Sequence, residues 1–198
     1  MGRTASALRG NILEAALTLF ATHGYRGTSL HDIASEVGCS KASLLYHFAN
    51  KDALLTELLT PAGQGLAELD GRLDGLTGAQ AAETAVDGFV DLALRYRREL
   101  QLLFSDLPEM LCNPALSGIP DSTEQLLSAL AGRSEADEDR VAAWMVIGGV
   151  FITAASDVRV PDETLRAQMI RSALLALGRT PGRPTERPTG AGPHTTPR

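Results

Sequence analysis

The chain has 198 residues, of which 44% are hydrophobic and 21% are charged, and its formal net charge is −6. This composition is typical of a globular protein that buries a core of its own, and it argues against a disordered chain. A bilayer span needs about 18 apolar residues, and the longest apolar run, 141–155, is shorter and interrupted by Thr153, so we expect no contact with a membrane. The charged residues among the first thirty also predict that no signal peptide is present.

The charge is distributed unevenly along the chain. Residues 1–60 carry five basic and five acidic side chains, residues 61–178 carry nine and eighteen, and residues 179–198 carry four and one. Because the acidity lies outside the first sixty residues, the overall charge does not exclude contact with nucleic acid there. The small number of cations predicts modest non-specific affinity for DNA.

The two cysteines, Cys39 and Cys112, fall in what we expect to be separate parts of the chain. A secreted disulfide scaffold would hold more cysteines, so we predict a cytoplasmic location. Each cysteine is compatible with a small buried hydrophobic position, and oxidation as a switch stays open as an alternative.

The first predicted element is a helix with a single apolar stripe. Apolar residues recur at spacings of three and four from Leu8 to Phe20. Gly24 follows the stripe, and we expect it to end the helix in a left-handed conformation.

Two short helices are predicted next, over residues 28–37 and 40–48, with a tight turn at Gly38 between them. Thr28 and Ser40 are the expected N-caps of the two helices. Asn50 is the expected cap of a further helix that begins at Lys51. Residues 1–60 therefore predict an N-terminal three-helix, helix-turn-helix domain.

Pro61, Gly63 and Gly65 disturb the pattern, and we place the domain boundary there, within what is compatible with one long helix. Residues 61–178 show no strand signal and predict a C-terminal helical bundle, which makes the fold class all-α. The expected helices are one opened by a Thr77–Gln80 capping box and closed near Arg95, Arg97 and Arg98, a short one at 100–107, one capped by Asp121 and Glu124, one at 140–156, and one from Pro161 to a stop at Gly178.

Three further expectations concern this second part and its end. Pro108, Pro114, Gly118 and Pro120 predict a loop. The helix at 140–156 is apolar almost all round, so we expect both of its faces to be covered. Residues 179–198 are rich in proline, glycine and arginine and predict a disordered tail.

The second short helix of the N-terminal part has two different faces. Leu44 and Phe48 are placed to point into the core. The opposite face carries small and hydrogen-bonding side chains with one cation: Lys41, Ala42, Ser43, Tyr46 and His47. A helix with such a face fits the major groove of B-DNA, which is about 12 Å wide.

The stretch from Gly27 to Leu54 resembles the N-terminal signature of the TetR (tetracycline-repressor) family. The residues that carry the resemblance are Thr28, Ile33-Ala34, Gly38, Ser40, Leu44, Tyr46-His47-Phe48, Lys51 and Leu54. Leu45 departs from the signature, because many members have an aromatic residue there. The resemblance covers residues 10–55, whereas residues 61–178 are similar only in the number and order of their helices.

The resemblance implies a role for each matched position. Thr28 with the amides of its helix, Tyr46 and Lys51 would hold backbone phosphates. Lys41, Ala42, Ser43 and His47 would face base edges. Taken singly, Tyr46 is also compatible with a half-buried core position and Lys51 with a solvated helix start. The candidate DNA-binding residues are Thr28, Ser40, Lys41, Ala42, Ser43, Tyr46, His47 and Lys51.

The resemblance also implies a dimer and a ligand cavity. One recognition helix reads few base pairs, so two subunits on a palindromic double-stranded operator are expected. The candidate dimer-interface residues are Met145, Gly148, Ile152, Met169 and Ala173, with packing inside one subunit as the alternative. The candidate effector-pocket residues are Phe89, Tyr96, Phe104, Met110 and Trp144, which are also compatible with plain core positions. An apolar or amphiphilic effector would release the repressor from DNA, and Arg95, Arg97 or Arg98 would receive an acidic head group if the effector has one.

The sequence leaves two alternatives to a ligand-controlled repressor. An enzyme is not expected, because the four histidines lack metal-ligand spacing and no phosphate-binding glycine loop is present. We therefore predict no metal site, no cofactor and no catalytic residue. The second alternative keeps DNA binding but replaces the small ligand by a protein partner or by oxidation of Cys39.

Overall fold

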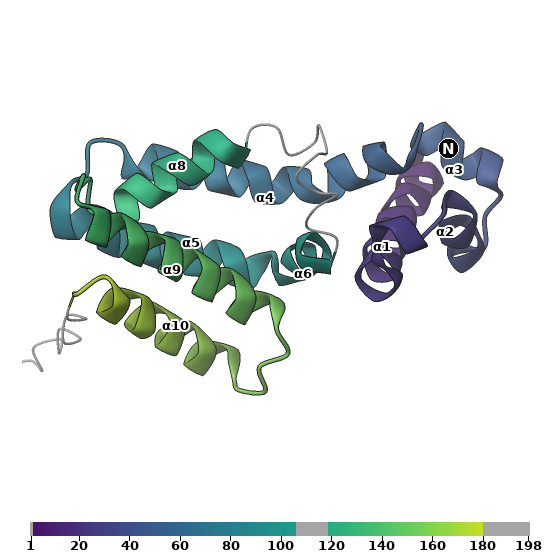
Figure 1. Ribbon diagram of the computed structural model, residues 1–198. Coiled ribbons are helices and arrows are strands. Elements are labelled where there is room, and N and C mark those ends of the chain that lie inside the picture. Colours follow the sequence, from purple (N-terminus) through teal and green to yellow (C-terminus); the bar gives the residue numbers. More distant parts are fainter. Residues whose placement is uncertain (1, 106–118, 180–198) are drawn as a thin grey trace, which may run out of the picture.

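A computed structural model describes residues 2–105 and 119–179 of the chain. These residues form nine helices and no strand, which confirms the all-α prediction. The helices α1 (Gly2–Gly27), α2 (Leu30–Val37) and α3 (Lys41–His47) form a small head at one end of the molecule (Figure 1). The remaining helices, which build a larger body, are α4 (Lys51–Leu73), α5 (Gly78–Arg95), α6 (Arg97–Ser105), α8 (Ile119–Leu130), α9 (Asp137–Ala155) and α10 (Asp162–Ala176).

Local sequence signals explain the geometry of the head. Gly38 ends α2 with φ of 72°, so the left-handed turn predicted there is confirmed. The side chains of Ser40 and Asn50 accept hydrogen bonds from the third residue beyond each, as predicted for N-caps. Gly24 breaks α1 with φ of 76° and ψ of 160°, so the helix stops there as predicted with a positive φ, and residues 25–27 form a separate turn after the kink.

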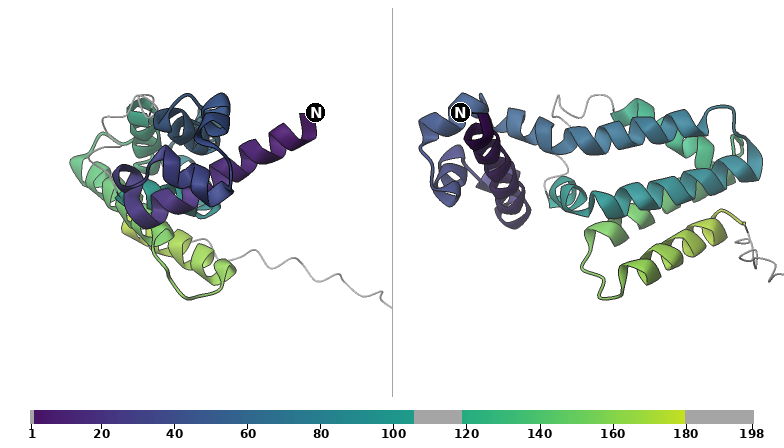
Figure 2. Two further views of the ribbon diagram at one scale, coloured as in Figure 1. Left: turned by 90° about the vertical axis from the view of Figure 1, so that its right-hand side faces the viewer. Right: turned by 180° about the vertical axis from the view of Figure 1, so that it is seen from behind.

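The head has a closed hydrophobic core. Phe20 of α1, Ile33 of α2 and Leu44 of α3 are fully buried against one another, together with Leu54 at the start of α4. Leu102 of α6 is fully buried in the same cluster. The head is therefore held to the body through α6 as well as α4, and both figures of the whole molecule place α6 beside α1 (Figures 1 and 2).

The helix α4 runs without a break through the boundary predicted at residues 60 and 61. Pro61 lies inside it, and its N-terminal half packs in the head whereas its C-terminal half packs in the body. A Cβ at Gly65 would lie 2.5 Å from Leu92 Cδ1 of α5. The glycine therefore permits a close approach of α4 and α5, and its apparent disturbance of the helical pattern is a packing requirement.

The helix ends predicted in the body are confirmed in part. Thr77 is the N-cap of α5, where the sequence predicts the helix to open, although its side chain makes no capping hydrogen bond. Arg95 ends α5 as expected, whereas Arg97 and Arg98 begin α6, because the helix breaks at Tyr96. Helix α8 has already begun at Ile119, so Asp121 is inside the helix and does not cap it.

The last two helices begin and end close to the expected places. Asp137, Glu138 and Asp139 form the acidic first turn of α9. Their negative charges are stabilised there by the positive end of the helix dipole. Pro161 precedes α10, and Gly178 follows it with φ of 68°. No helix among the described residues combines the length and apolarity needed to cross a bilayer. The loop predicted from Pro108 to Pro120 is wrong at its end, because Pro120 lies in the first turn of α8, where a proline needs no hydrogen-bond donor. The rest of that loop, 108–118, and the predicted tail beyond residue 179 lie outside the described residues.

Candidate nucleic-acid interface

The recognition helix α3 is held by its inner face and presents its outer face to solvent. Leu44 is fully buried and Phe48 is 3% exposed, so both anchor the helix to the head core. Lys41, Ala42 and Tyr46 are exposed, as the sequence predicts for a face that contacts another molecule. The helix stands away from the body at the end of the molecule (Figure 1).

Tyr46 is the most exposed large hydrophobic side chain of α3, at 85%. The half-buried ring of His47 lies edge-on to it, with 5.3 Å between ring centroids. The alternative of a half-buried core position for Tyr46 is therefore wrong. Its hydroxyl is free to reach a phosphate oxygen beyond the protein surface.

The start of α3 also presents small polar groups. Ser40 is exposed while its hydroxyl oxygen accepts a 3.1 Å hydrogen bond from the Ser43 amide. This bond fixes the first turn, which carries Lys41 and Ala42. A rigid, shallow surface of this kind suits contact with base edges.

Thr28 has a different role from the predicted one. It is 2% exposed, and its hydroxyl donates to the carbonyl oxygens of Leu19 (3.1 Å) and Gly24 (2.9 Å) in α1. Ser29 caps α2 instead and forms a capping box with Asp32. The predicted phosphate contact of the Thr28 side chain is therefore wrong, because its hydroxyl is buried and satisfied inside the head.

The capping box also changes the electrostatics at the start of α2. The carboxylate of Asp32 accepts hydrogen bonds from the Ser29 amide (2.8 Å) and hydroxyl (2.7 Å), and these bonds lower the pKa of Asp32. A negative charge thus lies where the positive end of the helix would otherwise attract a phosphate.

Lys51 is directed into the head. Its Nζ donates to the carbonyl oxygens of Tyr25 (2.6 Å) and Thr28 (3.0 Å) and lies 4.2 Å from the centroid of the Tyr25 ring. The ammonium group therefore ties the start of α4 to the end of α1. The phosphate contact and the solvated position expected for Lys51 are therefore both wrong, because its ammonium group is bound inside the head.

Arg9 is similarly engaged within the head. It pairs with Glu57 of α4 and lies over the ring of Phe48. Lys41 is the cation of α3 and is exposed on its outer face. A head with a three-helix core, a glycine turn and an exposed polar second helix defines a helix-turn-helix DNA-binding protein.

Comparisons with known proteins assign the family. Residues 12–58 match the family described as bacterial regulatory proteins, tetR family. The chain is 30% identical over 146 residues to the HTH-type transcriptional regulator RutR of Escherichia coli K12, and the match covers 74% of this chain and 66% of RutR. The chain belongs to the TetR family of bacterial transcriptional regulators.

Two further similarities agree with this assignment. Over 51 residues, 26% of each chain, the protein is 45% identical to the HTH-type transcriptional repressor KstR2 of Mycobacterium tuberculosis. The crystal structure of Mycobacterium smegmatis AmtR is similar over 88% of this chain and 87% of AmtR, with a TM-score of 0.66 and 28% identity. The fold of the body is therefore also that of the family, although the sequence resemblance had been limited to the head.

The residues predicted for an effector pocket do not all come together. Phe89 and Tyr96 line a cavity of about 240 Å³ between α4, α5, α6, α8 and α9. Trp144 does not line this cavity, because it lies on the outer side of α9 and is 54% exposed. The side chains of Phe104 and Met110 lie outside the described residues.

The residues predicted for a dimer interface also divide into two groups. Met145 (70% exposed) and Ile152 (51% exposed) project from α9, and Gly148 lies between them on the helix. Met169 and Ala173 are buried where α10 packs on α9, and both also line the groove between these two helices. The helical pattern did not separate them because α10 has apolar residues on more than one side.

Sequence reasoning missed three features of the site. Leu45 is 41% exposed beside Tyr46 and belongs to the outer surface of α3. The capping role of Ser29 was readable from its spacing to Asp32. The burial of Leu102 of α6 in the head core was not readable, because it is a contact between residues far apart in the sequence.

Proposed function

We propose that the protein is a dimeric transcriptional repressor that binds a palindromic operator through α3 of each subunit and is released by a small apolar or amphiphilic molecule. The observation that carries the proposal is the exposed polar face of α3 on a head whose core fixes that helix from behind. Because the head offers few exposed cations, the affinity depends on the joint fit of two heads more than on charge.

The outer face of α9 supports the dimeric part of the proposal. Val141, Trp144, Met145 and Ile152 are each more than half exposed on this one helix. Large apolar side chains gathered on one face of a soluble protein are typical of an interface with another chain. The helix was expected to be covered on both faces, and one subunit covers only the inner one.

Two glycines of α9 point to the same conclusion. A Cβ at Gly148 or Gly149 would meet nothing within 4 Å, so packing inside the subunit does not require either glycine. Glycine costs a helix about 1 kcal/mol relative to alanine. A second helix approaching closely across a two-fold axis offsets that cost.

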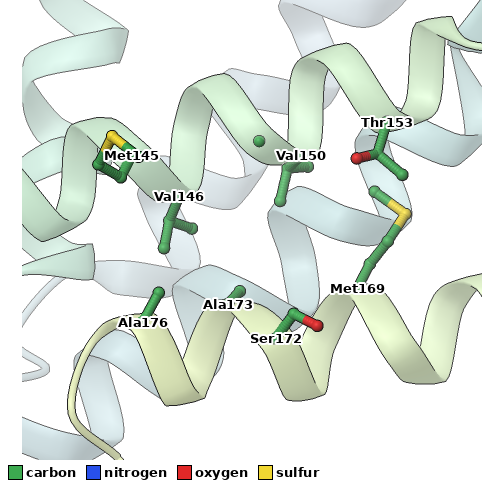
Figure 3. Close-up of a pocket in the computed structure, with 9 residues that line it drawn as sticks. Met145, Val146, Val150, Thr153, Met169, Ser172, Ala173 and Ala176 are labelled. Atoms are coloured by element: carbon green, nitrogen blue, oxygen red, sulfur yellow. The ribbon is translucent and has the colours of Figure 1, made fainter.

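The groove beside these glycines continues the same apolar surface. Figure 3 shows Met145, Val146 and Val150 of α9 above Ala173 and Ala176 of α10, on the two sides of a cavity of about 250 Å³. Side chains of a second copy would fill it when the two pairs of helices pack together.

The position of the internal cavity supports control by a ligand. Leu59 of α4 and Leu103 of α6 line the cavity and also pack in or against the core of the head. A molecule that displaces either side chain acts on the structure that orients α3. A tenfold to hundredfold change in operator affinity requires about 1.4–2.7 kcal/mol of coupling.

A gel-shift assay on DNA upstream of the protein's own gene tests the proposal. We expect a complex that saturates at two subunits per site and that a fraction of a metabolite extract dissociates in the presence of reductant. Dissociation only on oxidation, or only by the protein fraction of the extract, would replace the small ligand by the alternative modes of control. Failure of folded protein to retard any fragment more than random DNA would contradict the repressor itself.

A further inference from the structure

The cavity between α4, α5, α6, α8 and α9 has a uniform chemical character. Its walls are apolar side chains and helix backbone, and its polar side chains are all hydroxyls: Thr56, Thr60, Tyr96 and Thr123. None of the described residues that line it carries a charge. An ionised group buried inside would lose its hydration without gaining an opposite charge from the described lining, which costs several kcal/mol or more.

Two of the three arginines considered as partners for an acidic head group are paired with carboxylates. Arg97 donates to Asp162 (3.0 Å), and Arg98 donates to Glu14 (2.8 Å) of α1. Arg95 lies over the ring of Tyr96, and none of the three lines the cavity. An anionic ligand therefore has no cation to pair with among the described residues of the lining.

The hydroxyls of α4 are restricted in what they offer a ligand. Thr56 donates its proton to the carbonyl oxygen of Asp52 (2.8 Å), and Thr60 donates to that of Thr56 (2.7 Å). Each oxygen keeps lone pairs that can accept, but neither has a second proton to donate. These two groups therefore favour a ligand that brings a hydrogen-bond donor.

We propose that the effector is an uncharged, largely apolar molecule whose polar end donates a hydrogen bond to Thr56 or Thr60. The inference rests on the proposed function and specifies the chemistry of its ligand. The selectivity comes from the absence of charged side chains among the described lining residues. Neutral alcohols and phenols bind, whereas carboxylates, phosphate esters and ammonium compounds are rejected.

The proposal also gives the polar end of the ligand a defined place. Thr56 is three residues before Leu59 on α4, and Leu59 is 6% exposed in the head core. A ligand anchored at Thr56 or Thr60 therefore occupies the end of the cavity next to the head, where its bulk bears on Leu59 and Leu103.

A matched competition series tests the charge selectivity. The full chain binds the neutral fluorophore N-phenyl-1-naphthylamine, whose emission rises in apolar surroundings, and decan-1-ol, decanoate and decylammonium compete for it at pH 7. We expect decan-1-ol to bind at least about tenfold more tightly than either ion. Decyl methyl ether, which accepts but cannot donate, should bind several-fold more weakly than the alcohol. Equal competition by decanoate or decylammonium overturns the proposal, and equal competition by the ether overturns its hydrogen bond.

Two glycines of α4 provide a test of the location. Gly63 lines the cavity and Gly71 does not, and a Cβ at either position meets nothing within 4 Å. Gly63→Leu should weaken probe binding at least about tenfold, while Gly71→Leu should leave it unchanged and share any gain in helix stability. Equal affinities in the two variants, or no probe binding to the parent protein, would show that the cavity is not the site.

A charge placed at Thr60 tests the cause of the selectivity. Thr60 is exposed at the edge of the cavity, so a long side chain there has room. Thr60→Lys should invert the preference toward decanoate, and Thr60→Met should bind the alcohol less tightly without gaining the carboxylate. No gain of decanoate in the lysine variant counts against the proposal. If the alcohol binds selectively yet never weakens the operator complex, the ligand class stands and the release step of the proposed function fails.

Discussion

Two helices of this protein present surfaces to solvent that differ in kind. The outer face of α3 carries small polar residues, one lysine and an exposed tyrosine, whereas the outer face of α9 carries valine, tryptophan, methionine and isoleucine. Both helices are anchored by buried residues on the opposite side. The difference indicates two partners, a hydrated polyanion at α3 and a second apolar surface at α9.

The largest expected effect is the loss of the dimer. Ile152→Glu places a charge in the middle of the apolar face of α9, and we expect a folded monomer at micromolar concentration with operator affinity reduced by a hundredfold or more, on the order of 3 kcal/mol. Sedimentation velocity and fluorescence anisotropy measure the two quantities. Ala67→Glu, on the exposed side of α4, is the matched control.

A second variant keeps this prediction independent of folding. Gly149→Leu adds a side chain where one subunit has open space, so it should raise helix stability by about 1 kcal/mol and still weaken the dimer. A dimer as strong as that of the parent protein in both variants would show that α9 is not the interface.

The next largest effect concerns the polar face of α3. Tyr46→Ala should reduce operator affinity by about tenfold or more per dimer, because each subunit loses a contact worth about 1 kcal/mol or more. The thermal midpoint should not change, because the side chain is 85% exposed. Tyr46→Phe separates the hydroxyl from the ring, and retention of full affinity by the alanine variant would exclude Tyr46 from the interface.

The two lysines near the interface are expected to behave differently. Lys41→Gln should weaken operator binding and reduce the slope of log affinity against log salt by about one unit per subunit if Lys41 contacts a phosphate. Lys51→Met should instead lower the thermal midpoint, because Nζ satisfies the carbonyl oxygens of Tyr25 and Thr28, and should leave the salt slope unchanged. A lower slope in the Lys51 variant would restore the phosphate contact that the sequence predicted.

The smallest expected effect is on thermal stability and comes from a residue of the body, so DNA binding by the head should not change. Burial raises the pKa of Asp70, against a smaller opposing effect of a hydrogen bond with Ser122, and its Oδ1 is buried without a partner. Because the folded state has the higher pKa, the ionised carboxylate costs stability above that pKa, and the cost disappears as pH falls below the unfolded value of about 3.9.

Asp70→Asn should therefore raise the thermal midpoint at pH 7 by a few degrees, with a gain that shrinks toward pH 4. Calorimetry across this pH range measures the gain. A gain that is independent of pH would assign the effect to packing, and operator affinity should not change in either case.

The head was predictable from sequence to the level of individual side chains, because its signals are local. Gly38, Ser40 and Asn50 act on residues within four positions of themselves, and the structure confirms all three. The errors at Thr28 and Lys51 arose because a polar side chain near an interface can also turn inward, and only the tertiary structure shows which donors the head needs for its own carbonyl groups.

The body was predictable only as a set of helices. The stripes of α9 and α10 locate both helices, but they do not show that Met169 and Ala173 face the subunit core while Met145 and Ile152 face outward. The cavity is formed by five helices that are far apart in the sequence. No single helix therefore predicts that the described lining is uncharged or that the cavity reaches the core of the head.

A footprint of the protein on an operator selected from its own promoter region tests the central claim most directly. The account predicts two symmetric protected half-sites with major-groove contacts about one helical turn apart, and both half-sites should need about tenfold more of the Tyr46→Ala variant for the same protection. A single unsymmetric site, or protection that the Tyr46→Ala variant leaves intact, would contradict it.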